Sequence, residues 1–287
     1  MTTIETTSGW RAFWARGGWW RAVLLAVAYI ALYIGAGLLI GALFGDRIDG
    51  DDVLSSPESL FFGLTSGVLI GSLILAAFAA SLGWFPRLFG RQPIGGRWWM
   101  WLAPLLTVGA IVLRLFGTDY AAYTAGVIAT AFVTGLFIGF AEEVLCRGLV
   151  VTMLRDSGKS EWVVMVLSSL VFALLHSVNI LGGQSLLKVA LTVVFAFGFG
   201  ACMYLTLRVT GNLIWPVLLH ALYDPTQFLA TGGIDETHSA EPSALLELAA
   251  PANMLYVVLG VVALLAVRGR VGRSTSDGLE HAAPAQR

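Results

Sequence analysis

The chain has 287 residues, of which 57% are hydrophobic and only 12% are charged, with a mean hydropathy of +0.80. A water-soluble globular domain of this size does not have this composition, so we predict an all-α, polytopic membrane protein. The net charge is −1, and no basic cluster is arranged to follow a phosphate backbone, which argues against a nucleic-acid partner.

Eight apolar segments have about the length of helix that crosses the hydrocarbon of a bilayer, roughly 20 residues. They cover residues 22–44, 60–82, 98–116, 121–154, 162–180, 187–207, 212–229 and 254–267. The fourth is unusually long and the last is short. The first is too long for the apolar part of a cleaved signal sequence. We therefore predict a transmembrane helical bundle of about eight spans that retains its first helix.

The connections between these segments alternate in charge. Basic residues precede the first span and follow the second, fourth, sixth and last: Arg11, Arg16, Arg21, Arg87, Arg91, Arg97, Arg155, Lys159, Arg208, Arg268, Arg270 and Arg273. Acidic residues follow the first and seventh spans: Asp46, Asp49, Asp51, Asp52, Glu58, Asp235, Glu236 and Glu241. Because cytoplasmic loops carry the positive excess, we expect both termini in the cytoplasm and the chain in a bacterial plasma membrane.

The fourth segment carries three ionisable side chains in the stretch AEEVLCRG, namely Glu142, Glu143 and Arg147. Such groups are costly in hydrocarbon unless they are paired or line a wet cavity. Glu143 and Arg147 are four residues apart on one helix face and can form an ion pair. Glu142 points about 100° away and remains available for chemistry. The alternative for the pair is a buried salt bridge that only fixes helix packing.

Two later segments each carry a histidine, His176 in FALLHSVN and His220 in NLIWPVLLHALYD. A lone histidine in a membrane helix is more often a packing residue. At about 1.5 Å per residue, however, Glu142 and His176 lie roughly 20 and 23 Å from the predicted cytoplasmic ends of their helices. His220 and Asp224 approach the same layer from the seventh span. We therefore expect four polar groups from three helices to converge.

The segment around Asp224 has further signals. Asp224 lies four residues after His220, so it can orient or neutralise the imidazole, or else be an interfacial residue at a helix end. Pro225 disfavours continued regular helix, which we expect to open the backbone toward a cavity. Gly135 and Gly139, on the fourth segment, form a GxxxG pattern that lets a neighbouring helix approach closely.

Two remaining features predict no chemistry. Cys146 and Cys202 lie in apolar surroundings, so we expect neither a disulfide nor a thiolate metal site. After Arg273 the sequence STSDGLEHAAPAQR is small and polar, and cannot bury enough apolar surface to fold alone. We predict a disordered tail over residues 274–287.

The order of the motifs resembles that of a known family. The chain carries Glu142-Glu143-x-x-x-Arg147, then Phe172-x-x-x-His176, then His220 after an Asn-Leu-x-x-Pro segment. This pattern is similar to that of the CPBP intramembrane proteases, which include the type II CAAX prenyl endopeptidases and bacterial relatives named for bacteriocin processing or immunity. The resemblance covers residues 133–224. It implies glutamate-dependent peptide hydrolysis in the membrane, without a required metal or other cofactor.

The resemblance also implies roles and a division of the chain. By position, Glu142 and His176 would activate a water, while Glu143 with Arg147 would hold the first carboxylate in place. The corresponding parts of the chain are three amino-terminal helices, a catalytic helical part, an outer loop with the last helix, and the tail, at residues 1–120, 121–230, 231–273 and 274–287.

One position departs from the family pattern. The resemblance implies that His220 and the residue four positions later stabilise the oxyanion, and family members commonly have Asn there, whereas this chain has Asp224. An ionised carboxylate only accepts hydrogen bonds and repels an oxyanion. Asp224 is therefore either protonated or it orients His220.

We favour an intramembrane endopeptidase acting on a peptide or protein substrate, prenylated or membrane-embedded, that enters laterally or from the cytoplasmic side. A zinc-dependent protease is an alternative, because the two histidines and two carboxylates are also possible zinc ligands, although HExxH is absent. A non-catalytic membrane immunity or scaffold protein is another alternative. A proton-coupled transporter is the last, since carboxylate and histidine relays occur in pumps.

Overall fold

The structure is a computed structural model that describes residues 9–234 and 243–272, and these residues contain helices and loops but no strand. The predicted tail and three of the acidic residues, Asp235, Glu236 and Glu241, lie outside the described residues. Seven helical units within the described ranges are long and apolar enough to cross a membrane: Trp19–Arg47, Pro57–Leu82, Trp98–Gly117, Ala125–Asp156, Glu161–Ile180, Leu186–Thr210 and Ala244–Ala266. The all-α transmembrane class is confirmed, and this number is close to the eight spans predicted.

The α-helices follow one another along the chain with short connections. They are α1 (Gly9–Ala15), α2 (Trp19–Phe44), α3 (Pro57–Leu60), α4 (Ser66–Leu82), α5 (Phe85–Leu88), α6 (Leu102–Gly117), α7 (Ala125–Glu143), α8 (Val151–Asp156), α9 (Glu161–Leu175), α10 (Leu186–Thr210), α11 (Ile214–Thr231), α12 (Ala244–Ala249) and α13 (Ala252–Ala266). Short 3₁₀ or π segments extend several of them, including η2 (Phe61–Thr65), η5 (Val144–Val150) and η6 (His176–Ile180).

The predicted seventh span corresponds to α11, which is not among the seven strongly apolar units. It carries His220, Asp224 and Gln227, and these polar side chains lower its hydropathy. The expectation that the helix becomes irregular at Pro225 is wrong, because α11 continues through that residue to Thr231. A proline inside a helix removes one backbone hydrogen bond, a loss that neighbouring helices can compensate in a membrane bundle.

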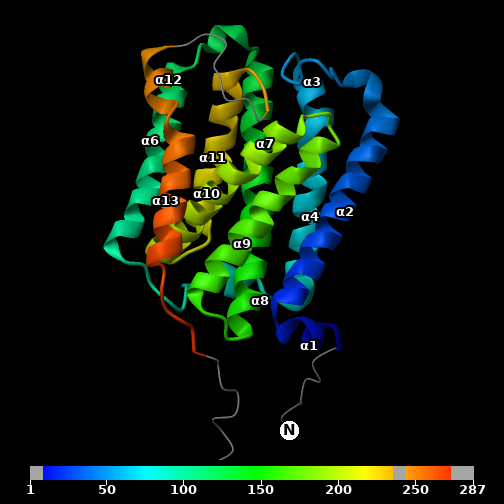
Figure 1. Ribbon diagram of the computed structural model, residues 1–287. Helices are drawn as coiled ribbons and strands as arrows, with labels where there is room; N and C mark the ends of the chain where they lie inside the picture. The colour runs from blue at the N-terminus through cyan, green and yellow to red at the C-terminus, as the bar shows by residue number, and fades with distance from the viewer. Residues whose placement is uncertain (1–8, 235–242, 273–287) are drawn as a thin grey trace, which may run out of the picture.

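The bundle has a central group of helices and two flanks (Figure 1). α7, α9, α10 and α11 form the centre, and α7 packs along α11 while α10 packs against α9 and α13. α2 and α4 lie together on one side, with α4 also against α7, and α6, α12 and α13 lie on the other. The ionisable residues of α7 and α11 are therefore enclosed by helices on both sides.

Close contact between α7 and α11 depends on the two glycines of the GxxxG pattern. A Cβ atom on Gly139 would lie 2.6 Å from the backbone nitrogen of Ala221 and 2.7 Å from the carbonyl oxygen of Val217. A Cβ atom on Gly135 would lie 2.4 Å from the carbonyl oxygen of Ala221. Because those atoms are backbone, no side-chain movement relieves the overlap, and only glycine permits this separation.

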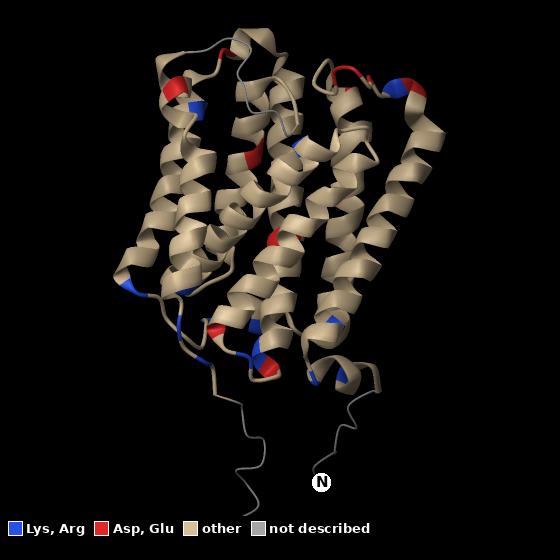
Figure 2. Ribbon diagram, viewed as in Figure 1, with Lys and Arg blue, Asp and Glu red and all other residues tan. Residues whose placement is uncertain are grey.

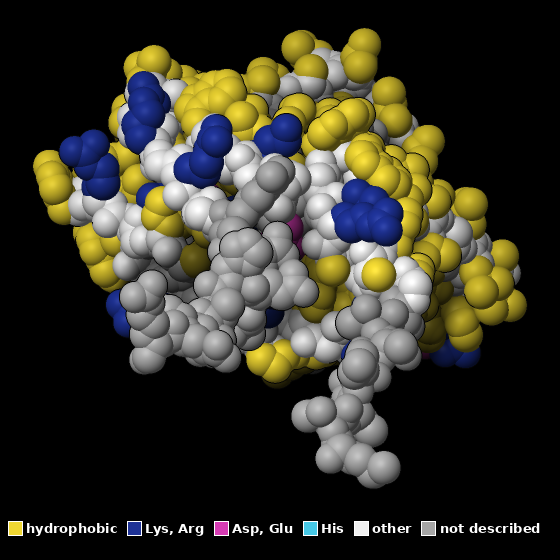
Figure 3. All heavy atoms as spheres, turned by 90° about the horizontal axis from the view of Figure 1, so that it is seen from below, with side chains coloured by type: hydrophobic (Ala, Val, Ile, Leu, Met, Phe, Trp, Pro, Cys, Tyr) yellow, Lys and Arg dark blue, Asp and Glu magenta, His cyan; other side chains and the backbone are white. Residues whose placement is uncertain are grey.

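The charged residues gather at the two ends of the bundle (Figure 2). Most arginines lie at the end where α1, α8 and the start of α9 meet, which we call the basic end, and Figure 3 shows their side chains spread over this face. Acidic residues predominate at the opposite end, which we call the acidic end and which includes the loop from Asp46 to Glu58. This separation agrees with the charge alternation read from the sequence.

A buried ion network lies inside the basic end. Glu161 accepts hydrogen bonds from Arg155 at 2.8 and 2.7 Å, contacts Nη1 of Arg208 at 3.4 Å, and is also bonded by the hydroxyl of Tyr204. Arg155 reaches the side chain of Gln92 at 2.6 Å as well. The sequence places Arg155 and Arg208 in connections on the predicted cytoplasmic side, and the structure buries both side chains between helices at that end.

Candidate active site

Glu143 and Arg147 form a buried ion pair at the junction of α7 with the π segment η5. The distance from Arg147 Nη1 to Glu143 Oε1 is 3.1 Å, and neither side chain is exposed. The Arg147 guanidinium also stacks on the ring of Phe172, 4.3 Å from its centroid. A π turn inside a long helix is rare and often marks a functional site. This π segment begins directly after Glu142 and Glu143. The ion pair of Glu143 with Arg147 that the sequence spacing predicts is present in the structure.

His220 completes the hydrogen bonding of Glu143. Its Nδ1 lies 2.8 Å from Glu143 Oε1, the same oxygen that bonds Arg147. Because a carboxylate only accepts, Nδ1 of His220 carries the proton of this bond. The resemblance implied that Glu143 would hold the first carboxylate, but its hydrogen bonds run to Arg147 and to the imidazole. Glu143 therefore fixes the orientation of His220.

Glu142 lies on the other side of His220. Its Oε2 atom is 4.0 Å from His220 Nε2, and its side chain is 21% exposed, in contrast to the fully enclosed Glu143. Oε2 of Glu142 makes no hydrogen bond within the part of the chain that the structure describes. The two adjacent glutamates thus differ in surroundings, and the one predicted to be available for chemistry faces a cavity.

His176 reaches the same cavity from α9, where it begins η6. Its Nδ1 lies 3.1 Å from the carbonyl oxygen of Phe172. A carbonyl only accepts, so Nδ1 carries the proton and the neutral ring keeps a lone pair on Nε2. The hydrogen bond to the carbonyl group of Phe172, four residues earlier in α9, therefore determines which ring nitrogen of His176 carries the proton.

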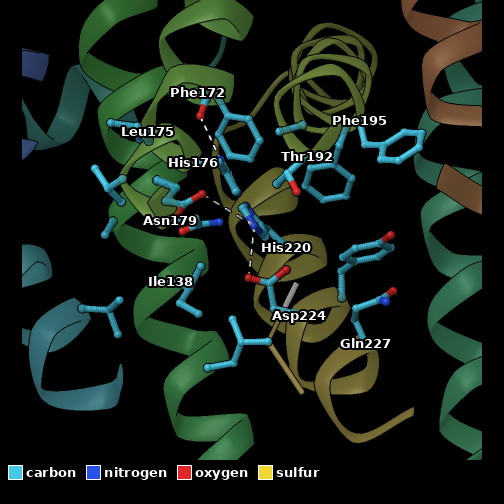
Figure 4. A pocket seen from close by; sticks show the side chains of 18 of the residues that line it. Ile138, Phe172, Leu175, His176, Asn179, Thr192, Phe195, His220, Asp224 and Gln227 are labelled. Carbon is cyan, nitrogen blue, oxygen red and sulfur yellow. Dashed lines mark hydrogen bonds and ion pairs between the residues drawn. The ribbon is translucent and has the colours of Figure 1, made fainter. Parts of the chain in front are cut away.

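Asp224 lies one helical turn beyond His220, with Oδ2 3.4 Å from His220 Nε2. Figure 4 shows His176, His220 and Asp224 around one space, with the interactions of His220 and His176 drawn as dashed lines. The rings of Phe172 and Phe199 pack edge-on against His220, at centroid distances of 5.6 and 5.0 Å. His220 is therefore held by carboxylates at both ring nitrogens and by aromatic rings at its sides.

The cavity has a volume of about 220 Å³. It is lined by Glu142, His176, His220 and Asp224 together with apolar, aromatic and amide side chains from α2, α4, α7, α9, α10, α11 and α13. The structure thus brings together all four of the polar groups that the sequence places at similar depth, while Glu143 and Arg147 lie behind the wall of the cavity.

Two residues that line the cavity, Tyr223 and Asn253, and a neighbour of theirs, Arg114, were missed in the sequence. Tyr223, next to Asp224, donates from its hydroxyl to Asn253 Oδ1 at 3.0 Å and lies under the guanidinium of Arg114, 4.5 Å from the ring centroid. Asn253 belongs to α13, far along the chain. Arg114 is a buried charge inside a predicted span, and that signal could have identified it. Nothing in the sequence connects Asn253 to the site.

Comparison with known families gives one match. Residues 124–226 match the model of the family described as Type II CAAX prenyl endopeptidase Rce1-like. The predicted site residues, from Glu142 to Asp224, all lie within the matched range. The family resemblance read from the motifs is therefore confirmed over this segment. Comparisons with curated proteins and with solved structures found no match.

Proposed function

We propose that this chain, through its segment similar to type II CAAX prenyl endopeptidases, is an intramembrane endopeptidase that uses glutamate and histidine to activate water. The observation that carries the proposal is the convergence of Glu142, His176, His220 and Asp224 on one cavity inside the bundle. The family match independently supports a peptidase of the CAAX type. A salt bridge that only fixes helix packing, or a non-catalytic scaffold protein, does not require a cavity beside its carboxylates.

In the proposed reaction, Glu142 is the general base. It takes a proton from a water whose oxygen attacks the carbonyl carbon of the scissile peptide bond. The lone pair on Nε2 of His176 accepts the other O–H of that water and orients it. Glu142 then gives the proton to the leaving nitrogen as the carbon–nitrogen bond breaks, which yields a carboxylic acid and an amine and restores the carboxylate.

His220 stabilises the negative charge that develops on the substrate oxygen. With Nδ1 donating to Glu143 and Nε2 facing Asp224, the ring is surrounded by groups that only accept hydrogen bonds, which fits a doubly protonated imidazolium. Its Nε2–H points to the cavity and supplies the donor that an oxyanion needs. In this arrangement Asp224 orients His220 and does not itself contact the oxyanion as a donor.

Substitution of the base tests the proposal. Membrane peptides from cells that express the wild-type chain are compared with those from cells that express Glu142→Gln or His176→Ala. We expect each variant to lose cleavage by about 10²–10⁴-fold, the usual contribution of a general base. Glu58→Gln, in the exposed ion pair with Arg47, is the matched control. Identical peptide profiles for wild type and Glu142→Gln would falsify the proposal.

Removal of metal distinguishes the proposed glutamate-dependent peptidase from a zinc-dependent protease. Among the described residues, no three or more His, Cys, Asp or Glu side chains are grouped as they are in a metal site. We expect the Glu142-dependent cleavage to continue at an unchanged rate after the purified protein is treated with a strong chelator. Loss of activity on chelation, with recovery on adding zinc, would support the zinc alternative instead.

A further inference from the structure

The catalytic cavity extends from the catalytic groups toward one end of the bundle. Residues of α2, α4 and α7 line it around Glu142, and the rest of its lining comes from the second halves of α9 and α11, the first turns of α13, and the first part of α10. It also includes η6, which follows α9, and Ile234, which follows α11. The parts other than those around Glu142 lie toward the acidic end of the bundle (Figures 1 and 2). The mouth of the cavity therefore lies at the acidic end.

Toward the basic end, the bundle below the catalytic groups is solid. Every residue of η5, Val144–Val150, is buried, and so is every residue of α10 from Ala201 to Leu207. The ion network around Glu161 lies beneath them. Between Glu142 and Asp156 this packed region is about 20 Å thick, at 1.5 Å per residue. A peptide cannot reach Glu142 from the basic end without unfolding it.

A separate hollow exists at the basic end, but it does not lead to the catalytic groups. It is lined by residues of the loops and helix ends there, including Arg87, Arg91 and Arg155. It shares no lining residue with the catalytic cavity. Of the two ends of the bundle, the acidic end is the one toward which the cavity around Glu142 extends.

The distribution of charge relates the acidic end to a side of the membrane. Arginine-rich ends of helical membrane proteins face the cytoplasm. The basic end of this bundle collects most of the arginines, and the loop between α2 and α3 at the other end carries Asp46, Asp49, Asp51 and Asp52. The mouth of the cavity therefore faces away from the cytoplasm.

We propose that the substrate is a peptide segment presented at the extracytoplasmic surface of the membrane, which enters the cavity from the acidic end. This inference rests on the proposed endopeptidase function and differs from the lateral or cytoplasmic entry expected from the sequence. A chain terminus that is prenylated and kept in the cytoplasm does not reach this mouth.

The chemistry of the lining indicates which segment fits. No lysine or arginine is among the lining residues, whereas Glu142 and Asp224 are. The lining includes the amides of Asn179, Gln227 and Asn253, the last of which accepts a hydrogen bond from Tyr223, together with several aromatic rings. Glu142 and Asp224 repel a free carboxyl terminus beside the scissile bond, and the cationic His220 ring in the lining is already bonded to or faced by carboxylates. The segment is therefore neutral or basic and is cleaved within the chain.

Labelling of single cysteines tests the side of entry. Both native cysteines, Cys146 and Cys202, are fully buried, so the background is low. Gln227→Cys and Asn253→Cys place a thiol at the mouth, while Asp51→Cys and Arg91→Cys report the acidic and basic ends. Each variant is treated with a membrane-impermeant maleimide in right-side-out spheroplasts and in inverted vesicles.

We expect the two mouth variants to react in spheroplasts, as Asp51→Cys does, and to lose labelling in inverted vesicles, where Arg91→Cys reacts. Reaction of the mouth variants only in inverted vesicles overturns the proposal, and so does absence of reaction from either side. Reaction of Asp51→Cys only in inverted vesicles shows that the charge rule was misapplied and overturns it equally.

A second measurement connects access to catalysis. A bulky maleimide attached to Gln227→Cys from outside should block the cleavage that depends on Glu142, whereas the same reagent on Asp51→Cys should not. The labelling itself needs no hydrolysis. Outside labelling without any Glu142-dependent cleavage therefore contradicts the enzyme proposal alone, while intact cleavage with inside labelling contradicts only the proposed side of entry.

Discussion

At the scale of single residues, His220 has the largest number of functional contacts in the site. Glu143 bonds one ring nitrogen at 2.8 Å, and Asp224 and Glu142 face the other at 3.4 and 4.0 Å. The geometry assigns different tasks to these carboxylates according to enclosure. The fully enclosed Glu143 orients the ring, and the partly exposed Glu142 faces the cavity. Adjacent residues of the same type thus acquire separate roles because successive helix positions point in different directions.

Replacement of Asp224 by Asn tests its role. An Asn side chain has the same shape and can still accept from Nε2 of His220, so we expect Asp224→Asn to keep cleavage within about tenfold of wild type. Asp224→Ala removes the partner of the ring, and we expect a loss of about 10²–10³-fold, the usual cost of disturbing an oxyanion donor. Rates are measured on a substrate found by the peptide comparison. Equal activity of the Ala variant and wild type would contradict the orienting role.

The substitution Glu143→Gln distinguishes a role of Glu143 in orienting His220 from a purely structural role. The amide keeps the shape of the side chain but removes the charge that holds both Arg147 and His220. We expect kcat to fall by about 10²-fold or more with little change in KM, as when the orienting carboxylate of another catalytic imidazole is replaced. A purely structural residue would instead lower the amount of folded protein and leave the kcat of the remainder unchanged.

At the scale of elements, the close packing of α7 on α11 brings the two halves of the site together. Gly135 and Gly139 allow backbone contact with Ala221, which lies next to His220 in the chain. Gly200 on α10 similarly leaves room for Arg147, since a Cβ atom there would lie 2.9 Å from its Nη2 atom. The glycines therefore determine the distances between the residues of the candidate site as well as the stability of the bundle.

Gly139→Ala is expected to separate the two helices. The added methyl group meets backbone atoms, and overpacking of this kind costs about 1–3 kcal/mol. We expect a lower melting temperature and a loss of activity larger than the loss of folded protein, because Glu143 and His220 move apart. Gly109→Ala in α6 is the matched control, since a Cβ atom there meets nothing within 4 Å. If both variants melt at the same temperature, tight α7–α11 contact is not limiting.

At the scale of the whole molecule, the two ends of the bundle have different tasks. The basic end is closed by packed apolar side chains and by the network of Arg155, Glu161 and Arg208, whereas the acidic end opens into the cavity. In the proposed peptidase, exclusion of bulk water on one side and entry of the peptide from the other would strengthen the electrostatic interactions around the reacting groups. The polarity of the bundle therefore bears on both catalysis and substrate choice.

The network at the basic end should contribute strongly to stability. Glu161→Gln leaves two buried guanidinium groups without a counter-charge, and loss of one partner in a buried pair costs about 3–5 kcal/mol. We expect a large drop in melting temperature in detergent. Glu58→Gln breaks the exposed pair with Arg47 and should cost at most about 1 kcal/mol. A Glu161→Gln protein as stable as the Glu58→Gln control would show that the network is dispensable.

Much of the fold and part of the site could be predicted from the sequence. The apolar segments and the ion pair of Glu143 with Arg147 follow from residues close together in the chain, since helix period and hydropathy are local properties. The layer shared by Glu142, His176 and His220 follows from counting residues along helices of fixed rise. These features need no knowledge of how the helices pack.

Only the tertiary structure decided the remaining features. It assigned His220 as the partner of Glu143, buried Arg155 and Arg208 inside the bundle, and brought Asn253 to the same cavity as Glu142 and the two histidines. Each of these depends on how far every helix is rotated about its axis and which neighbours it touches. That rotation is set by contacts such as those of Gly139, between residues distant in the chain, so no local pattern encodes it.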